Sequence, residues 1–129
     1  MQTFRKEERL SEKKIIKELF DKGLSFYISP FKIIWLNSAI EGAYPAKIMI
    51  SVPSRNFRSA VDRNKIKRIS REAYRKNKQI LYESIKDPSK KMAFIIIYTG
   101  KYIMRYNDVE AKIILILQRL VKENEEVVK

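Results

Sequence analysis

The sequence predicts an α+β fold, a single-sheet two-layer sandwich with its elements in the order α-β-β-β-α-β-α. Two short segments, 30–37 and 45–52, place apolar side chains at every second position, which is the period of a half-buried strand. Residues 92–99 are apolar on both faces, which is typical of a central strand covered on each side. Helical spacing of apolar residues follows positions 11, 59 and 107, so helices are expected before, between and after the strands.

The first ten residues are polar and charged and are expected to form an extended arm. Ser11 is a candidate N-cap for a helix that runs to about residue 22. Gly23 follows this helix, and a glycine at that position commonly ends a helix in the left-handed conformation. The apolar stripe of the helix is wide enough to bury one edge and to leave another partly open.

Residues 24–29 are expected to form a short edge strand before the strand at 30–37. In the second strand, Phe31, Ile33 and Trp35 share one face and the alternate residues share the other. A turn around Gly42 leads to the strand at 45–52, and the short connection predicts that this strand is antiparallel to the previous one. The loop at 53–58 begins with Pro53, which cannot continue a central strand.

The segment 59–78 has the highest density of positive charge, with eight basic residues and one acid, Glu72, between positions 63 and 78. Ser59 and Asp62 have the spacing of a capping box, so a helix is expected to begin there and to run to about residue 85. Because this helix connects two strands, the sheet is expected to include a parallel pair. Its apolar face is one stripe at helical spacing, made of Ile66, Ile69, Ala73 and Ile80.

The opposite face of this helix is an i,i+4 ladder of Arg63, Lys67, Arg71 and Arg75 with no acid between them. Like charges at this spacing repel by about 0.2–0.5 kcal/mol per pair, and folding does not need them. An ordinary solvated face is the alternative, but such faces mix the two signs. A polyanion would turn the repulsion into attraction, so the ladder predicts a nucleic-acid partner.

The last helix is expected to begin after Asn107, a candidate N-cap with Glu110 three residues later. Residues 123–129 are polar and are expected to fray. The core face of this helix comprises Val109, Ile113, Ile116, Leu117 and Leu120.

The chain of 129 residues is expected to be one RNA-binding domain, 1–129. Its 28 Lys plus Arg against 15 Asp plus Glu give a net charge of +13, which favours nucleic acid over an anionic membrane surface as the partner. Cysteine and histidine are absent, which excludes disulfides, thiolate zinc sites and Ser-His or Cys-His nucleophiles. There is no apolar run typical of a signal peptide or a membrane span, so we expect a soluble, cytoplasmic protein.

Residues 60–75 read A-V-D-R-N-K-I-K-R-I-S-R-E-A-Y-R. This stretch resembles the signature of the bacterial ribonuclease P protein component, A-V-x-R-N-R-x-K-R-x-x-R-E-x-x-R. Lys65 stands where the signature has Arg, which keeps the charge but loses the forked phosphate geometry. Arg58 stands where a glycine is usual. The matching positions are Ala60, Val61, Arg63, Asn64, Lys67, Arg68, Arg71, Glu72 and Arg75.

The resemblance implies the accessory subunit of a ribozyme that removes 5′ leaders from precursor tRNA. The expected partners are the ribonuclease P RNA and precursor tRNA, and no membrane is expected. The RNA subunit would do the chemistry with Mg²⁺, while the protein would bind no cofactor and supply no catalytic residue. The implied fold is ribosomal protein S5 domain 2-like, with a left-handed βαβ crossover through the basic helix, against the usual preference. Arg9-Leu10, Leu19-Phe20 and Gly23 resemble the family's first helix and its end.

The resemblance also implies which residues touch RNA. Arg55 and Arg58, in the loop before the helix, are further candidate contacts, and Phe57 is expected to pack beside the helix start. Trp35 and Tyr74 are expected in the core, and no metal ligands are expected. The main RNA-contact set is Arg63, Asn64, Lys65, Lys67, Arg68, Arg71 and Arg75.

A second surface, the cleft for the single-stranded leader, is expected at Ile16, Phe20, Lys32 and Ile34. Rings are common in the family where Ile16 and Ile34 stand, so base stacking there should be weaker. Ordinary core packing is an equally good interpretation of these two aliphatic residues.

Other classes of function stay open at this point. A ribosomal-type or other structural RNA-binding module, without a role in tRNA processing, would bind RNA and leave cleavage unchanged. A protein nuclease would need clustered carboxylates for metal, and the sequence offers no such cluster. Membrane-surface binding would need bulky apolar residues free for lipid, whereas this helix commits its own to the core.

Overall fold

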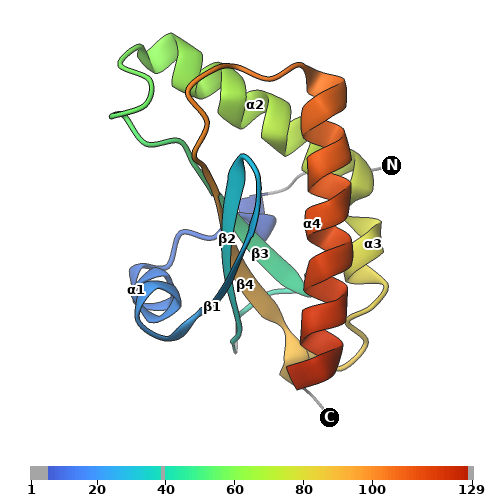
Figure 1. The fold of residues 1–129 in the computed structure, drawn as a ribbon. Helices are drawn as coiled ribbons and strands as arrows, with labels where there is room; N and C mark the ends of the chain where they lie inside the picture. The colour runs from blue at the N-terminus through green and yellow to red at the C-terminus, as the bar shows by residue number, and fades with distance from the viewer. Residues whose placement is uncertain (1–5, 39, 128–129) are drawn as a thin grey trace.

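The computed structural model describes residues 6–38 and 40–127 and shows a single four-stranded sheet with helices on its two faces (Figure 1). The α+β class and the predicted order of elements are confirmed. In chain order the elements are η1 (Lys6–Glu8), α1 (Lys13–Lys22), β1 (Leu24–Ile28), β2 (Phe31–Asn37), β3 (Ala46–Ser51), α2 (Ala60–Asn77), α3 (Gln79–Tyr82), η2 (Pro88–Lys90), β4 (Met92–Tyr98) and α4 (Tyr106–Val127).

The strands lie in the order β1-β2-β4-β3, with β4 antiparallel to β2 and parallel to β3. The predicted parallel pair across the basic helix is therefore confirmed. The strands β2 and β3 do run in opposite directions, as predicted, but they are not neighbours, because β4 lies between them. The central position suits β4, since it is apolar on both faces and nearly all of its side chains are buried.

The two faces of the sheet have separate hydrophobic cores. Phe31, Ile33 and Trp35 share one face as predicted, and this face packs against α2, α3 and α4, which form the main helical layer. The opposite face, with Ile34 and Ile95, packs against Leu19 of α1. Figure 1 shows this arrangement, with α1 alone on one side of the sheet and α4 on the other.

The predicted caps of α1 are wrong at both ends. Its N-cap is Glu12 rather than Ser11, and no side chain caps it. Gly23 has a φ of −63°, so it is not left-handed. A glycine is needed there for space instead, because an added Cβ would lie 2.4 Å from the Leu19 carbonyl oxygen and 2.5 Å from Cγ2 of Ile34. The chain turns tightly from α1 into β1 over this contact.

The predicted extended arm is partly outside the described residues, and its second half is not a free arm. The Leu10 N–H donates to the Ile48 carbonyl at 2.8 Å, and Arg9 forms a parallel bridge with Ile48. Glu8 is fully buried and pairs with Lys78, with 2.5 Å between Oε1 and Nζ. The segment 6–10 thus lies along the edge of β3 and is anchored to the junction of α2 and α3.

The last helix is longer than the sequence pattern predicted. It begins at Tyr106, so Asn107 lies inside its first turn and is not the N-cap. Its polar end does not fray at residue 123, because Trp35 Nε1–H donates to Glu123 Oε1 at 2.8 Å. Asn37 Nδ2 donates to Oδ1 of Asn124 at 2.9 Å. These bonds attach the helix to β2, and the predicted core face of the helix is buried throughout.

Candidate nucleic-acid interface

The helix α2 presents a cationic face because its apolar face is fixed in the core. Ser59 is the N-cap as predicted, and its Oγ accepts from the Asp62 N–H at 3.4 Å. Ile66, Ala73 and Tyr74 are buried against the sheet and α4, which confirms the predicted packing of Tyr74. The chain stays helical through α3 to Tyr82, after a break at Lys78.

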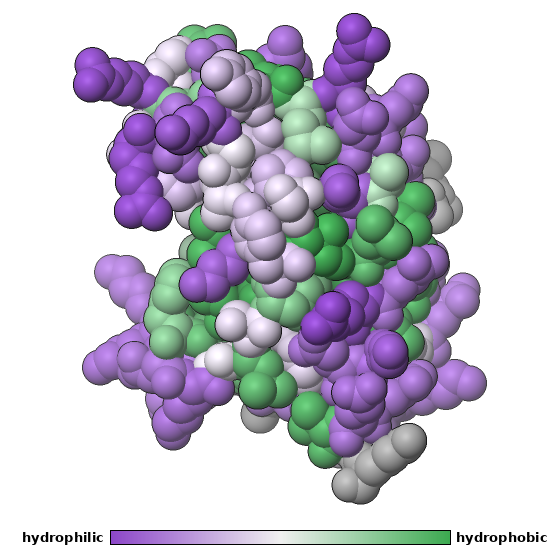
Figure 2. All heavy atoms as spheres, in the orientation of Figure 1, coloured by the Kyte–Doolittle hydropathy of each residue, from purple (hydrophilic) through white to green (hydrophobic). Residues whose placement is uncertain are grey.

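The predicted RNA-contact residues differ in how much of each side chain reaches solvent. Asn64, Lys65 and Arg68 are exposed, whereas Lys67 and Arg71 are half-buried. In Figure 2, hydrophilic side chains project at the upper end of the molecule, near α2 and the loop before it, and again at the lower left around α1. Two exposed cations, Lys65 and Arg68, lie in the first half of α2, and Lys76 is exposed near its end.

Arg63 is half-buried, and its guanidinium group is folded back onto the preceding loop. Its Nη1 donates to the Phe57 carbonyl at 2.5 Å and to the Arg58 carbonyl at 3.0 Å. These carbonyls belong to the loop that precedes α2, and a carbonyl at a loop end otherwise needs another donor. Arg63 thus fastens that loop to the first turn of the helix.

Arg75 is also engaged, and here the predicted acid-free ladder is wrong. Its Nη2 and Nε donate to the two carboxylate oxygens of Glu72, at 2.6 Å and 3.0 Å. This hydrogen-bonded pairing lowers the pKa of Glu72 and raises the pKa of Arg75. Glu72 is not a member of the i,i+4 ladder, but an i,i+3 pair lies within reach of a long arginine side chain.

Arg71 lies where α2 approaches the N-terminal segment. Burial lowers the pKa of Arg71, and the positive charge of Arg9 lowers it further. The two residues line one cavity at the edge of β3. Sequence reasoning missed Arg9 as a candidate, although the Arg9-Leu10 pair was part of the resemblance that could have drawn attention to it.

The predicted cleft residues gather around α1 and β2, on the opposite face of the sheet from α2. Phe20 is 57% exposed and Lys32 is exposed, while Ile16 is half-buried. Ile34 is only 6% exposed, since it lies in the core beneath Gly23 and α1. The surface of this region is therefore formed by Phe20, Lys32 and part of Ile16, and Ile34 supports it from below.

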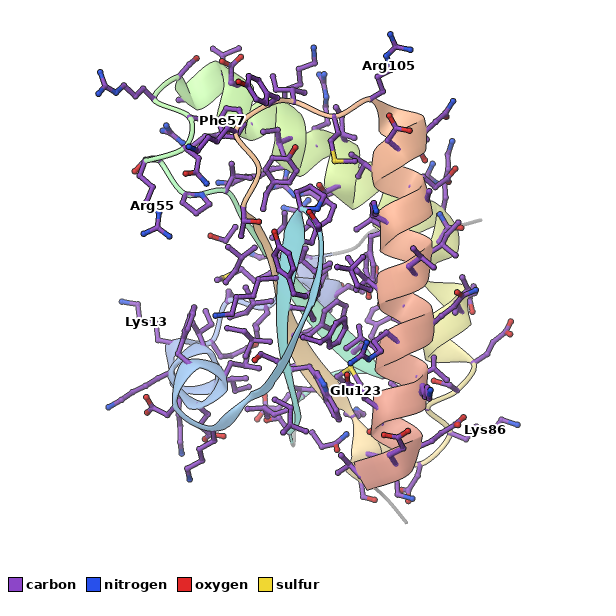
Figure 3. All side chains as sticks on the ribbon, in the orientation of Figure 1. Lys13, Arg55, Phe57, Lys86, Arg105 and Glu123 are labelled. Carbon is purple, nitrogen blue, oxygen red and sulfur yellow. The ribbon has the colours of Figure 1, made fainter. Side chains whose placement is uncertain are left out.

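The loop at 53–58 presents Arg55 and Arg58 to solvent, whereas Phe57 is buried with its ring centroid 6.0 Å from that of Tyr98. Figure 3 shows that Arg105, just before α4, lies at the same end of the molecule as Arg55 and Phe57. The Tyr98 hydroxyl donates to the Tyr102 carbonyl, which ties the loop after β4 to the same site. No periodic pattern in the sequence indicates Arg105, because this residue lies outside any amphipathic stripe.

A comparison with known protein families shows to which family the chain belongs. The family model described as Ribonuclease P matches residues 4–121, nearly the whole chain. The chain belongs to the ribonuclease P protein family. The family that residues 60–75 pointed to is thereby confirmed.

Two relatives show how much of the ribonuclease P family pattern the chain shares. A ribonuclease P protein component from Porphyromonas gingivalis is 37% identical over 83 residues, which are 64% of this chain and 60% of that protein. One from Petrotoga mobilis is 37% identical over 95 residues, 71% of this chain and 77% of that protein. The chain thus spans about 60% of the length of the Porphyromonas relative and more of the Petrotoga one.

The ribonuclease P fold is confirmed by a solved structure, that of the RNase P protein from Thermotoga maritima. The two chains superpose with a TM-score of 0.69 at 24% sequence identity, over 87% of this chain and 96% of the other. At this identity the likeness concerns the fold alone. The sheet and its helices are therefore those of a ribonuclease P protein.

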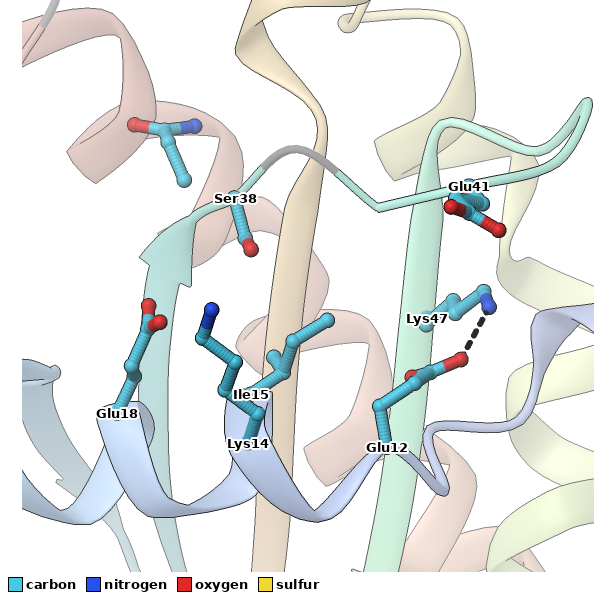
Figure 4. A pocket seen from close by; sticks show the side chains of 8 residues that line it. Glu12, Lys14, Ile15, Glu18, Ser38, Glu41 and Lys47 are labelled. Atoms are coloured by element: carbon cyan, nitrogen blue, oxygen red, sulfur yellow. Dashed lines mark hydrogen bonds and ion pairs between the residues drawn. The ribbon is translucent and has the colours of Figure 1, made fainter.

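A polar pocket lies between α1 and the β2–β3 connection of this ribonuclease P protein (Figure 4). Lys47 donates to Glu12 across it at 2.7 Å, and this hydrogen bond lowers the pKa of Glu12. Glu18 and Glu41 also line it, so the pocket mixes both signs and suits a polyanion less well than α2 does.

Within residues 6–38 and 40–127, no group of three or more acidic side chains is placed to hold a metal ion. No helix in the same ranges is long and apolar enough to cross a membrane.

Proposed function

We propose that this chain is the protein subunit of a ribonuclease P, which binds the catalytic RNA and the 5′ leader of precursor tRNA and assists 5′-end maturation. The observation that carries the proposal is the cationic first half of α2, set on a helix whose apolar face is locked in the core of a ribonuclease P fold. The exposed side chains that would contact phosphates are Asn64, Lys65 and Arg68, with Lys67 and Arg71 beside them.

Phosphate neutralisation would supply most of the binding free energy. Each cation that contacts a phosphate releases condensed counterions, so affinity should fall steeply as salt rises. Arg68 and Lys65 are exposed and can reach a backbone without breaking a contact inside the protein. Arg63 and Arg75 would have to give up their present partners first, so their main contribution is to shape the surface.

The leader would lie near α1 in this proposal. Phe20 offers a ring for base stacking, which is worth about 1–3 kcal/mol per base, and Lys32 offers a cation for the backbone. Ile34 adds little surface because it is buried, so the leader contact would depend mainly on Phe20. A single strand would therefore meet a smaller stacking surface here than a cleft lined by several rings.

The chemistry would belong to the RNA subunit and its Mg²⁺ ions. The chain has neither histidine nor cysteine, so it lacks the side chains that most often act as a general base or an activated nucleophile at neutral pH. Its positive charge would instead lower the metal-ion concentration that the RNA needs, because both neutralise the same phosphates.

Reconstitution tests the proposal. The chain is added to a bacterial ribonuclease P RNA, and cleavage of precursor tRNA is followed at a Mg²⁺ concentration too low for the RNA alone. We expect cleavage to begin only when the protein is present. An unchanged rate would contradict the proposal and favour a structural RNA-binding module, and cleavage by the protein after all RNA is removed would favour a protein nuclease.

A further inference from the structure

We propose that the exposed ring of Tyr102 stacks on an unpaired base of RNA, at a site formed by two loops at one end of the molecule. The loops are residues 53–58, between β3 and α2, and residues 99–105, between β4 and α4. The inference rests on the proposed function only for the identity of the RNA, which is either the catalytic RNA or precursor tRNA. The stacking site itself follows from the arrangement of the two loops.

Tyr102 gives the 99–105 loop a large aromatic surface that nothing in the chain covers. Its side chain is 84% exposed, the highest value among the large apolar residues that the structure describes. Ile103 beside it is also exposed. Single exposed apolar side chains are common on proteins, so exposure alone decides nothing. A nucleobase can cover such a ring with its own π-face, and this pairing tolerates any base.

The backbone that carries Tyr102 is held in place. The Tyr98 hydroxyl donates to the Tyr102 carbonyl. At the start of the loop, the Thr99 N–H and the Thr99 hydroxyl each donate to the Pro30 carbonyl at 2.8 Å. A loop that is already ordered has less conformational freedom to lose when its exposed ring binds a ligand. The ring of Tyr102 is therefore preorganised for stacking.

The two loops meet at one buried ring, that of Tyr98. Its centroid lies 6.0 Å from that of Phe57, which belongs to the 53–58 loop. The same Tyr98 hydroxyl holds the 99–105 loop through Tyr102. Figure 3 shows Arg55, Phe57 and Arg105 at the same end of the molecule. The exposed ring and the cations of both loops thus belong to one surface.

The charge of this surface favours RNA as the occupant. Neither loop contains an acidic residue, and the nearest acids along the chain, Asp62 and Asp108, lie in the first turns of α2 and α4. Cations hold the phosphates of a strand while a ring takes a base, and this combination is typical of proteins that bind single-stranded nucleic acid. The exposed cations on the two loops are Arg55, Arg58, Lys101 and Arg105.

Dependence on the bases tests the stacking contact. The unchanged chain and Tyr102→Ala are titrated with a short single-stranded RNA of mixed sequence and with the same strand lacking its bases. We expect Tyr102→Ala to weaken binding of the intact strand by about 5-fold or more, the effect of one stacked base. Binding of the strand without bases should stay unchanged. Equal binding of the intact strand by both proteins, or an equal loss with both strands, overturns the proposal.

Two further variants separate a ring contact from other effects. Tyr102→Phe keeps the ring and should bind the intact strand within about 2-fold of the unchanged protein. Leu115→Ala removes an exposed apolar side chain from α4 and should have no effect. A loss for Tyr102→Phe as large as that for Tyr102→Ala would make the hydroxyl the contact and would overturn stacking. The chain should fold in all these variants, because the bond that holds residue 102 uses its backbone carbonyl.

The salt dependence of binding gives an independent readout. Tyr102→Ala removes no charge, so the salt slope should stay the same while the affinity falls. Arg105→Ala should instead reduce the slope by about one, because it removes a phosphate contact. A change of slope in Tyr102→Ala as large as that in Arg105→Ala would contradict a stacking role.

Ribonuclease P RNA then shows which RNA supplies the base. A loss of affinity of Tyr102→Ala for that RNA alone assigns the base to the catalytic RNA. A loss that appears only when precursor tRNA binds the assembled complex assigns it to the substrate. If the chain activates cleavage and Tyr102→Ala changes neither step, the inference is wrong and the proposed function stands. A base-dependent response to the short strand from a chain that does not activate cleavage keeps the site and rejects the function.

Discussion

The arginines of α2 differ in what their guanidinium groups contact. Arg63 donates to two backbone carbonyls of the preceding loop, and Arg75 donates to both oxygens of Glu72. Arg68 is exposed. Substitutions along one basic face should therefore separate into those that change stability and those that change RNA binding.

We expect Arg63→Ala to lower the free energy of unfolding by about 1 kcal/mol, because two loop carbonyls lose a charged donor at a partly exposed site. Arg68→Ala should change it by less than about 0.5 kcal/mol, while it reduces the salt slope of RNA binding by about one. Urea unfolding and binding at several salt concentrations measure the two effects. Equal stability of the two variants would contradict the structural role of Arg63.

Residue patterns in the sequence predicted which face of a helix is buried better than they predicted which groups form hydrogen bonds with each other. The stripe of Ile66, Ile69 and Ala73 could be read from helical spacing because burial follows the period of the helix. The bond from Arg63 to the Phe57 carbonyl could not, since it depends on the path of a loop. The sequence indicated that Gly23 ends the helix. It did not show that a larger residue would clash there, because the Ile34 side chain that fills the space comes from another element.

At the scale of elements, one buried polar cluster joins the N-terminal segment to the end of α2. Glu8 Oε1 accepts from Lys78 Nζ at 2.5 Å and from the Tyr82 hydroxyl at 2.6 Å. The Tyr82 hydroxyl lies 3.4 Å from that of Tyr74. The break in the helix at Lys78 coincides with this cluster.

Removal of one partner of this ion pair should be costly. We expect Glu8→Ala to lower the free energy of unfolding by about 3–5 kcal/mol, because it removes the carboxylate that pairs with the buried Lys78 ammonium. Glu7→Ala is the matched control, since Glu7 is exposed one residue away and its loss should cost less than about 0.5 kcal/mol. Denaturant unfolding compares the two, and a loss below 1 kcal/mol for Glu8→Ala would show that the segment is not anchored through this pair.

The same cluster predicts a loss of stability at high pH. Burial is the main cause that raises the pKa of Tyr74 above its ordinary value near 10. Above about pH 10 the unfolded chain therefore releases a proton that the folded chain keeps, so stability present below that pH falls by up to about 1.4 kcal/mol per pH unit. In Tyr74→Phe the alkaline decline should be shallower.

Unfolding free energies between pH 8 and about pH 11 measure this difference. Tyr102→Phe serves as the control, since Tyr102 is 84% exposed and its loss should leave the decline as it is in the unchanged protein. Parallel declines for Tyr74→Phe and the unchanged protein would rule out the buried hydroxyl as the cause.

Strands and helices could be predicted where the residues that define them are close together in the sequence. The central strand β4 was recognised from its two apolar faces, and α2 from its cap and stripe. The insertion of β4 between β2 and β3 depends on pairing across the whole chain. The anchored residues Glu8 and Glu123 looked like solvent-exposed charges, because their partners Lys78 and Trp35 are far away in the sequence.

At the scale of the whole molecule, the sheet separates two surfaces. The helix α2 lies on one face, and α1 with Phe20 lies on the other. The edge of β3, where Arg9 and Arg71 line their cavity, lies between them.

The central claim is that the exposed cations of α2 attach the protein to the catalytic RNA. Cleavage of precursor tRNA by ribonuclease P RNA at low Mg²⁺ tests it most directly, with Lys65→Glu/Arg68→Glu compared against Lys86→Glu/Lys122→Glu. Both double variants change the net charge equally. Lys86 and Lys122 are exposed; Lys86 lies at the opposite end of the molecule from Arg55 (Figure 3), and Lys122 lies near the end of α4. We predict that the unchanged protein and the control variant support cleavage and that the α2 variant does not until Mg²⁺ is raised. Equal activation by both variants would contradict the account.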